Sequence, residues 1–248
     1  MAELLDFDSE LHIFETIMPK ERKTQRHFLY AFCLIVLIEL LCGSIESLKT
    51  VHFISKPSIV ISLIVFLTVK RQSLTASVFK LSLFALLFSL TGDVLLQFVQ
   101  QSSNYFLGGL VAFLLAHVMY ILIFLDKRGP HKPTLLQIIG LTTFTTLMVY
   151  ILFPHLGELQ IAVMAYMFII LLMMVSAIMR KGTVNSESYK LVFIGAMLFL
   201  ISDSILAINK FAYDIPCASI WIMLTYAFAQ YFILKGILEQ EKRSKIKN

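Results

Sequence analysis

Residues 106–125 read FLGGLVAFLLAHVMYILIFL, a run without a lysine, arginine, aspartate or glutamate. As a helix, which rises about 1.5 Å per residue, a run of this length crosses the ~30 Å hydrocarbon core of a bilayer. Similar apolar runs recur on both sides of it along the chain. The predicted spans are about 28–45, 54–69, 76–97, 106–125, 135–152, 159–179, 190–209 and 217–235.

The composition excludes a soluble protein. Hydrophobic residues make up 58% of the 248 residues and charged residues only 15%, against about 25% in globular proteins. The mean hydropathy is +0.82. Long unbroken apolar runs favour helices over the alternating strands of a membrane barrel. We therefore predict an all-α fold, a polytopic transmembrane bundle of eight helices over residues 28–238.

Basic residues predict the orientation of this bundle. Eighteen of the 21 lysines and arginines fall in alternate connections that also include both termini, whereas Lys49, Lys56 and Lys210 lie on the other side. Basic residues gather on the cytoplasmic side of membrane proteins, so both termini are predicted to be cytoplasmic. The net charge of +5 then reflects topology, and we expect no nucleic-acid partner. The membrane would be the inner membrane of a bacterium or an internal membrane of a eukaryote.

Two flanking segments complete the predicted organisation. Residues 1–27 form a cytoplasmic segment in which apolar side chains follow a helical spacing typical of an interfacial amphipathic helix. Residues 239–248 form a basic cytoplasmic tail. The three cysteines, Cys33, Cys42 and Cys217, lack the spacing of a disulfide framework or a zinc site, so we expect them to pack as small apolar side chains.

Four ionisable side chains fall inside the predicted spans: Glu39, Asp93, His117 and Asp203. Such groups are costly at membrane depth, so they are the first candidates for function. Asp93 and Asp203 lie about 20–25 Å from the cytoplasmic start of their helices, and Glu39 lies at a comparable height. The matched depth predicts a single polar pocket in the half of the bundle away from the cytoplasm.

Two carboxylic acids close together in surroundings poor in water do not both ionise, which leaves one acid protonated and one charged. That arrangement suits a hydrolysis in which one acid protonates the substrate while the other steadies a cation or activates water. The alternative is that each aspartate only hydrogen-bonds a neighbouring helix and fixes its register. A single intramembrane histidine does not predict a metal site, and no cofactor is expected.

Lys56-Pro57 is predicted to open the second span, because proline at a helix start needs no amide donor. Lys56 either pairs with a lipid phosphate at the rim of the pocket or extends to the membrane interface. The similar segments LFSLTGDVLL (87–96) and LFLISDSIL (198–206) further suggest a parallel internal repeat of helix pairs.

These motifs resemble the YhhN family of lysoplasmalogenase-like membrane proteins over about residues 50–235. The resemblance is carried by Lys56-Pro57, Gly92-Asp93, Ala116-His117 with Tyr120, Gly195 through Ser202-Asp203, and Tyr226 with Gln230. It implies hydrolysis of the vinyl ether bond of lysoplasmalogens, which gives a fatty aldehyde and glycerophosphoethanolamine or glycerophosphocholine. The expected partners are a lysophospholipid substrate and membrane lipids.

With the resemblance, we predict that Asp93 and Asp203 are the catalytic pair. The orienting or substrate-binding residues would be Glu39, Lys56, His117, Tyr120, Tyr226 and Gln230. Which aspartate gives the proton, the preferred headgroup and the oligomeric state stay open. An intramembrane aspartyl protease is disfavoured because Leu90-Thr91 replaces the Gly-x of a GxGD motif. The rival function from another class is a proton- or ion-coupled transporter, or a lipid-binding membrane protein, that uses the same acids.

Overall fold

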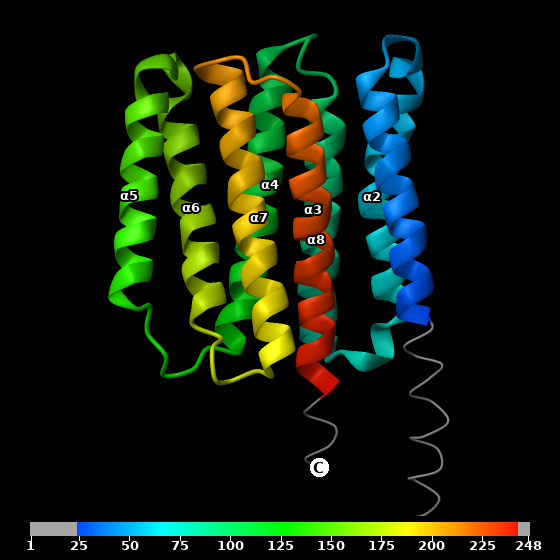
Figure 1. Cartoon of the computed structure of the whole chain (residues 1–248), viewed down its shortest axis with the longest axis vertical. Coiled ribbons are helices and arrows are strands. Elements are labelled where there is room, and N and C mark those ends of the chain that lie inside the picture. Colours follow the sequence, from blue (N-terminus) through cyan, green and yellow to red (C-terminus); the bar gives the residue numbers. More distant parts are fainter. Residues whose placement is uncertain (1–23, 243–248) are drawn as a thin grey trace, which may run out of the picture.

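The computed structural model describes residues 24–242, which form eight helices long and apolar enough to cross a membrane (Figure 1). The eight predicted spans are therefore confirmed, with ends that differ by a few residues. The helices are the N-terminal helix (Thr24–Ser44), α2 (Lys49–Val69), α3 (Ala76–Leu96), α4 (Ser103–Asp126), α5 (Leu135–Leu152), α6 (Gln160–Ile178), α7 (Ser186–Phe211) and α8 (Ala218–Lys242). The predicted amphipathic segment lies almost entirely outside the described residues, and α8 extends into the predicted tail.

Side chains at the loop ends fix where several helices begin. Thr75, Ser102, Thr134 and Asn185 each accept a hydrogen bond from a backbone amide in the first turn of the helix that follows. These amides have no partner within the helix, and an unpaired amide near the membrane is costly, so the caps mark the boundaries between loop and span.

The prediction that Lys56-Pro57 opens the second span is wrong. Helix α2 begins at Lys49, and Pro57 lies inside it. Proline has no amide hydrogen, so the carbonyl of Phe53, one turn earlier, loses its usual helical donor. The helix extends upstream because the segment that precedes the proline, VHFIS (51–55), is itself largely apolar. Membrane helices tolerate such a position where neighbouring groups satisfy the backbone.

The helices pack around two intimate pairs, α3 with α4 and α7 with α8. Helix α6 packs on α4 and α7, and α2 packs on α3 and α8. Helix α5 stands at one edge of the bundle and the N-terminal helix with α2 at the other (Figure 1). The outer faces carry large apolar side chains, as expected for surfaces that meet lipid.

Thr24 and Lys242 lie at the same end of the bundle (Figure 1). This fits the even number of spans, while the assignment of that end to the cytoplasm stays a prediction. Of the three cysteines, only Cys42 is buried. The expectation that all three pack inside is therefore wrong for Cys33 and Cys217, because the helix face and the loop that carry them point away from the core.

Candidate functional site

Asp93 is buried between α3 and α8. Its carboxyl is only 2% exposed, and Oδ2 accepts a hydrogen bond of 2.8 Å from the hydroxyl of Tyr226. Tyr226 in turn lies 3.4 Å from Nε2 of Gln230, one helical turn further along α8. Asp93 of α3 and Tyr226 of α8 are therefore in direct contact.

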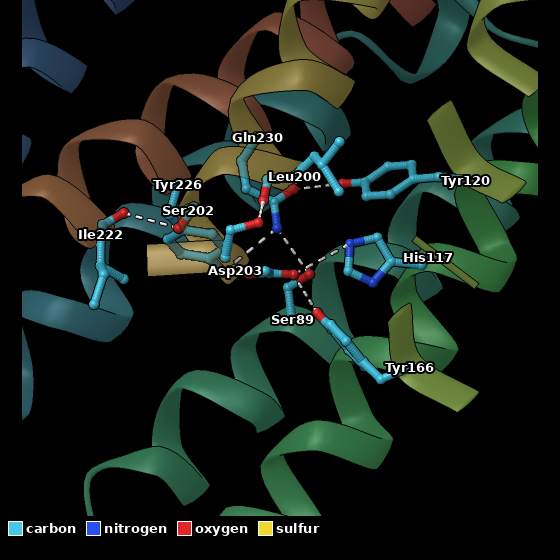
Figure 2. A network of polar contacts seen from close by, with 11 residues as sticks. Ser89, His117, Tyr120, Tyr166, Leu200, Ser202, Asp203, Ile222, Tyr226 and Gln230 are labelled. Atoms are coloured by element: carbon cyan, nitrogen blue, oxygen red, sulfur yellow. Dashed lines mark hydrogen bonds and ion pairs between the residues drawn. The ribbon is translucent and has the colours of Figure 1, made fainter. Parts of the chain in front are cut away.

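Gln230 links this pair to a second residue of α3 and to α4. Its Nε2 donates to Oγ of Ser89 on α3 at 2.8 Å, and its Oε1 accepts from the Tyr120 hydroxyl on α4 at 2.5 Å (Figure 2). All of these groups are buried. A fully bonded polar network of this kind holds α3, α4 and α8 in one register, because an unpaired polar group here would be costly. We call Asp93, Tyr226, Gln230, Ser89 and Tyr120 the Asp93 cluster.

Asp203 belongs to a second group, the Asp203 cluster, in which it is joined by Tyr166 of α6 and His117 of α4. The Tyr166 hydroxyl donates a hydrogen bond to Oδ2 of Asp203. His117 is fully buried, and its Nε2 lies 3.9 Å from the same oxygen. That distance is too long for a direct hydrogen bond, and both ring nitrogens of His117 are buried without a hydrogen-bond partner among the described residues. Figure 2 shows the three side chains converging from their separate helices.

Phe199 contacts both clusters. Its ring centroid is 4.5 Å from that of His117 and 5.5 Å from that of Tyr226. Asp93 and Asp203 are close enough for their charges to interact. The acids predicted to share one pocket therefore belong to two hydrogen-bonded clusters that are neighbours inside the bundle.

Of the two aspartates, Asp203 is the one that borders open space of appreciable size. It is 15% exposed, and two cavities of about 40 Å³ each meet at Asp203 and Tyr166. Apart from these polar groups the linings are largely apolar: one cavity runs between α4, α6 and α7, and the other extends to α5. Either volume could hold roughly three waters, at ~10–15 Å³ each. The Asp203 carboxyl thus faces a mainly apolar space that a hydrocarbon chain would suit.

Glu39 lies in a third group at the edge of the bundle, with Ser55 and His52 of α2. It is 1% exposed, and Oε2 accepts a hydrogen bond from Ser55. Oε1 is 3.1 Å from Nδ1 of His52. Lys56 follows Ser55 on the same helix and is half-buried. Both Glu39 and Lys56 are within electrostatic range of Asp93, so this group adjoins the Asp93 cluster.

Tyr166, Ser55 and His52 are not among the site residues predicted from the sequence. Tyr166 offered a signal, because it is the one tyrosine in the very apolar run 159–179 and a buried tyrosine hydroxyl usually needs a partner. His52 was missed because α2 begins earlier than the sequence suggested. Within residues 24–242, no three His, Cys, Asp or Glu side chains are grouped so as to hold a metal ion.

The sequence model of the YhhN family matches residues 51–237, most of the chain. The chain belongs to the YhhN family. The match includes Lys56, both aspartates, His117 and Tyr166, whereas the N-terminal helix with Glu39 precedes it. YhhN membership agrees with the multi-pass membrane architecture.

Several curated relatives are named lysoplasmalogenases. Lysoplasmalogenase TMEM86B of Sus scrofa is 32% identical over 160 residues, which cover 64% of this chain and 63% of the relative. TMEM86A of Bos taurus is 29% identical over 161 residues, covering 63% and 65%. The lysoplasmalogenase of Mycobacterium bovis is 30% identical over 158 residues, covering 61% and 58%. The chain thus spans less than two thirds of each of these relatives. No solved structure matches it.

Proposed function

We propose that this YhhN protein is a membrane-embedded lysoplasmalogenase, which hydrolyses the vinyl ether bond of a lysoplasmalogen to a fatty aldehyde and a glycerophospho-alcohol. The observation that carries the proposal is the placement of Asp203. It borders two apolar cavities, is held by Tyr166 and lies within electrostatic range of a second buried acid, Asp93. The names of the relatives support the same activity.

The apolar cavities suit the alkenyl chain of such a lipid. Their linings include Val163, Ala207 and the aromatic ring of Phe113 or Phe144. Helix α5 buries only Met148 and Leu152, so the cavity beside it is covered by a loosely attached helix. A chain entering from the membrane at this edge would bring its vinyl ether group to Asp203.

The reaction begins with a proton transfer to carbon. Asp203 gives its proton to the vinyl carbon that is farther from the ether oxygen, and an oxocarbenium ion forms at the carbon that bears the oxygen. Tyr166 donates to Oδ2 of Asp203, which leaves the other oxygen of the carboxyl group to carry that proton. Asp93, ionised, stabilises the cation through space, where few waters screen the charge.

Water completes the reaction. A water held near Nε2 of His117 adds to the cation and loses a proton to the Asp203 carboxylate, which regenerates the acid. The resulting hemiacetal then collapses: the bond from its carbon to the glycerol oxygen breaks, the hydroxyl proton leaves, and the glycerol oxygen gains a proton. One water is consumed in total. Lys56, on the far side of Asp93, is suited to the lipid phosphate.

Aldehyde release from a defined lysoplasmalogen by the purified protein in detergent tests the proposal. We expect Asp203→Asn to lower kcat by about 10²–10⁴, because it removes the proton donor. Asp93→Asn should lower kcat by about 10²–10³, because it removes a charge that stabilises the cation. The matched control is Asp126→Asn, at an exposed position at the end of α4.

Near-normal turnover in both Asp93→Asn and Asp203→Asn would exclude the pair from catalysis. If the unaltered protein bound lysolipid but released no aldehyde in detergent, where no gradient exists, the transporter or lipid-binding function would be favoured instead.

A further inference from the structure

A small cavity lies between the N-terminal helix, α2 and the start of α8, apart from the cavities at Asp203. Its volume is about 10 Å³, room for about one water. Its walls are largely apolar, with the polar side chains of Glu39, Ser44, His52 and Ser219 among its lining residues. A cavity of this size, with a carboxyl group in its wall, suits a small hydrogen-bonding group rather than a hydrocarbon chain.

Glu39 is buried at this cavity beside the His52 imidazole, 3.1 Å from Oε1, which balances the carboxylate charge only when the imidazole is protonated. Glu39 is 1% exposed, and among the side chains that the structure describes it forms no ion pair with a lysine or arginine. Its Oε2 accepts from Ser55, but Oε1 makes no hydrogen bond, since the geometry toward His52 is unsuitable. Burying a carboxylate without a cation is costly. The cavity therefore has the features of a site for a cationic hydrogen-bond donor.

We propose that this cavity binds the primary ammonium group of an ethanolamine headgroup and makes the protein selective for ethanolamine over choline lysolipids. The inference rests on the proposed function for the lysolipid itself. A primary ammonium has three N–H donors and is close in size to a water molecule, so it can bond Oε1 of Glu39 within the space present. The trimethylammonium of choline has no N–H donor, and its methyl groups are too large for this cavity.

The position of the cavity matches the order of groups in such a lipid. The chain-binding cavities and Asp203 lie among α4, α5, α6 and α7, and Asp93 is within electrostatic range of both Asp203 and Lys56. Lys56 and Glu39 come from α2 and the N-terminal helix, which stand at the edge of the bundle opposite α5 (Figure 1). A lysoplasmalogen has the same order of alkenyl chain, vinyl ether, glycerol, phosphate and amine. Helix α8 connects the small cavity to Asp93. Ser219 lines the cavity, and Tyr226, about 10 Å further along the helix, bonds Asp93.

Lys56 alone would bind phosphate from any phospholipid. A carboxylate beside it weakens binding of an anionic headgroup but strengthens binding of a zwitterion, whose positive group it meets. Glu39 lies on a helix outside the residues matched to the family.

Binding of non-hydrolysable lipids tests the inference independently of catalysis. The probes are 1-O-alkyl glycerophosphoethanolamine and its choline counterpart, titrated calorimetrically into the full chain in detergent. We expect the ethanolamine lipid to bind the unaltered protein at least about tenfold more tightly, with affinity falling as methyl groups are added to the nitrogen. Glu39→Gln should weaken binding of the ethanolamine lipid by about tenfold or more and leave that of the choline lipid unchanged.

A second variant, Gly43→Ala, tests the same cavity in case Glu39→Gln does not fold. At Gly43 an added Cβ would lie 3.4 Å from the His52 ring and 4.0 Å from Oε1 of Glu39, both ordinary contacts. Gly43→Ala should therefore fold and fill part of the cavity. It should weaken binding of the ethanolamine lipid and leave binding of the choline lipid unchanged. Glu158→Gln, which removes an exposed acid outside the cavity, is the control and should change neither affinity.

Equal affinities for the two lipids in the unaltered protein would overturn the inference, as would an unchanged preference in both Glu39→Gln and Gly43→Ala. Aldehyde release from the corresponding vinyl ether lipids is measured in parallel. It reports on the proposed function, so a failure of hydrolysis is distinct from a failure of headgroup selection.

Discussion

The Tyr166 hydroxyl controls how Asp203 presents its carboxyl group. It comes from α6, donates to Oδ2 and lines both cavities that meet at this acid. His117 approaches the same oxygen, so two side chains act on one atom while the second oxygen stays available for a proton. In the proposed reaction Tyr166 is therefore a positioning residue that acts through Asp203.

Replacing Tyr166 with phenylalanine should lower kcat by about ten- to hundredfold, because a hydrogen bond to a charged or reacting group is lost. KM should change little, since the apolar ring that lines the cavities remains. Steady-state aldehyde release measures both constants. Tyr150→Phe on α5, where the side chain is exposed, is the matched control and should behave as the unaltered protein. An unchanged kcat in Tyr166→Phe would remove this residue from the mechanism.

At the scale of the helices, close backbone approach holds α7 against α8. A Cβ on Gly195 would lie 2.9 Å from the carbonyl oxygen of Ala229 and 2.8 Å from the side chain of Ile233. Small residues let membrane helices approach in this way. The close contact sets the register that brings Phe199 and Asp203 on α7 beside Tyr226 on α8, so a residue without a side chain contributes to the geometry of the site.

Gly195→Ala should destabilise the protein by about 1–3 kcal/mol or more, because backbone atoms of α8 must move to admit the methyl group. Thermal unfolding in detergent measures the change as a fall in Tm. Gly140→Ala on α5 is the control, because nothing lies within 4 Å of its added Cβ. There alanine should leave Tm unchanged or raise it slightly, since it favours the helix. A Tm for Gly195→Ala equal to that of the unaltered protein would contradict the packing described.

Arg180 joins three helix ends on the side where the termini lie. Fully buried, it donates to Ser188 at the start of α7 and to Gln240 near the end of α8, and its guanidinium lies over the Phe124 ring. Burial lowers the pKa of Arg180 to about 10, which still leaves it charged at neutral pH. The side chain therefore contributes charge-assisted hydrogen bonds to the packing of this end.

At the scale of the whole molecule, the orientation in the membrane follows from the basic residues and decides which side the Glu39 cavity faces. Cys217 can test it, because it is exposed in the connection between α7 and α8, at the end opposite the termini. We expect a membrane-impermeant maleimide to label Cys217 in sealed vesicles only from the non-cytoplasmic side. Cys217→Ser should abolish that signal. Labelling from the cytoplasmic side would reverse the orientation.

The internal repeat stays a prediction. In the structure the two acids do lie at equivalent points, each about 25 Å along the first helix of a closely packed pair, α3 with α4 and α7 with α8. Their partners nevertheless differ, because Asp93 bonds Tyr226 of α8 whereas Asp203 bonds Tyr166 of α6.

The sequence by itself determined the eight spans, the shared end of the two termini and the four ionisable residues that lie inside the spans at membrane depth. These features depend on local hydrophobicity, since a polar group at membrane depth is costly wherever it falls along the chain. Only the tertiary structure decided that Phe199 contacts both His117 and Tyr226, that Tyr166 bonds Asp203 and that Glu39 lies beside His52 and Ser55. Such contacts depend on the rotation and spacing of neighbouring helices, which apolar periodicity leaves free and side-chain packing fixes.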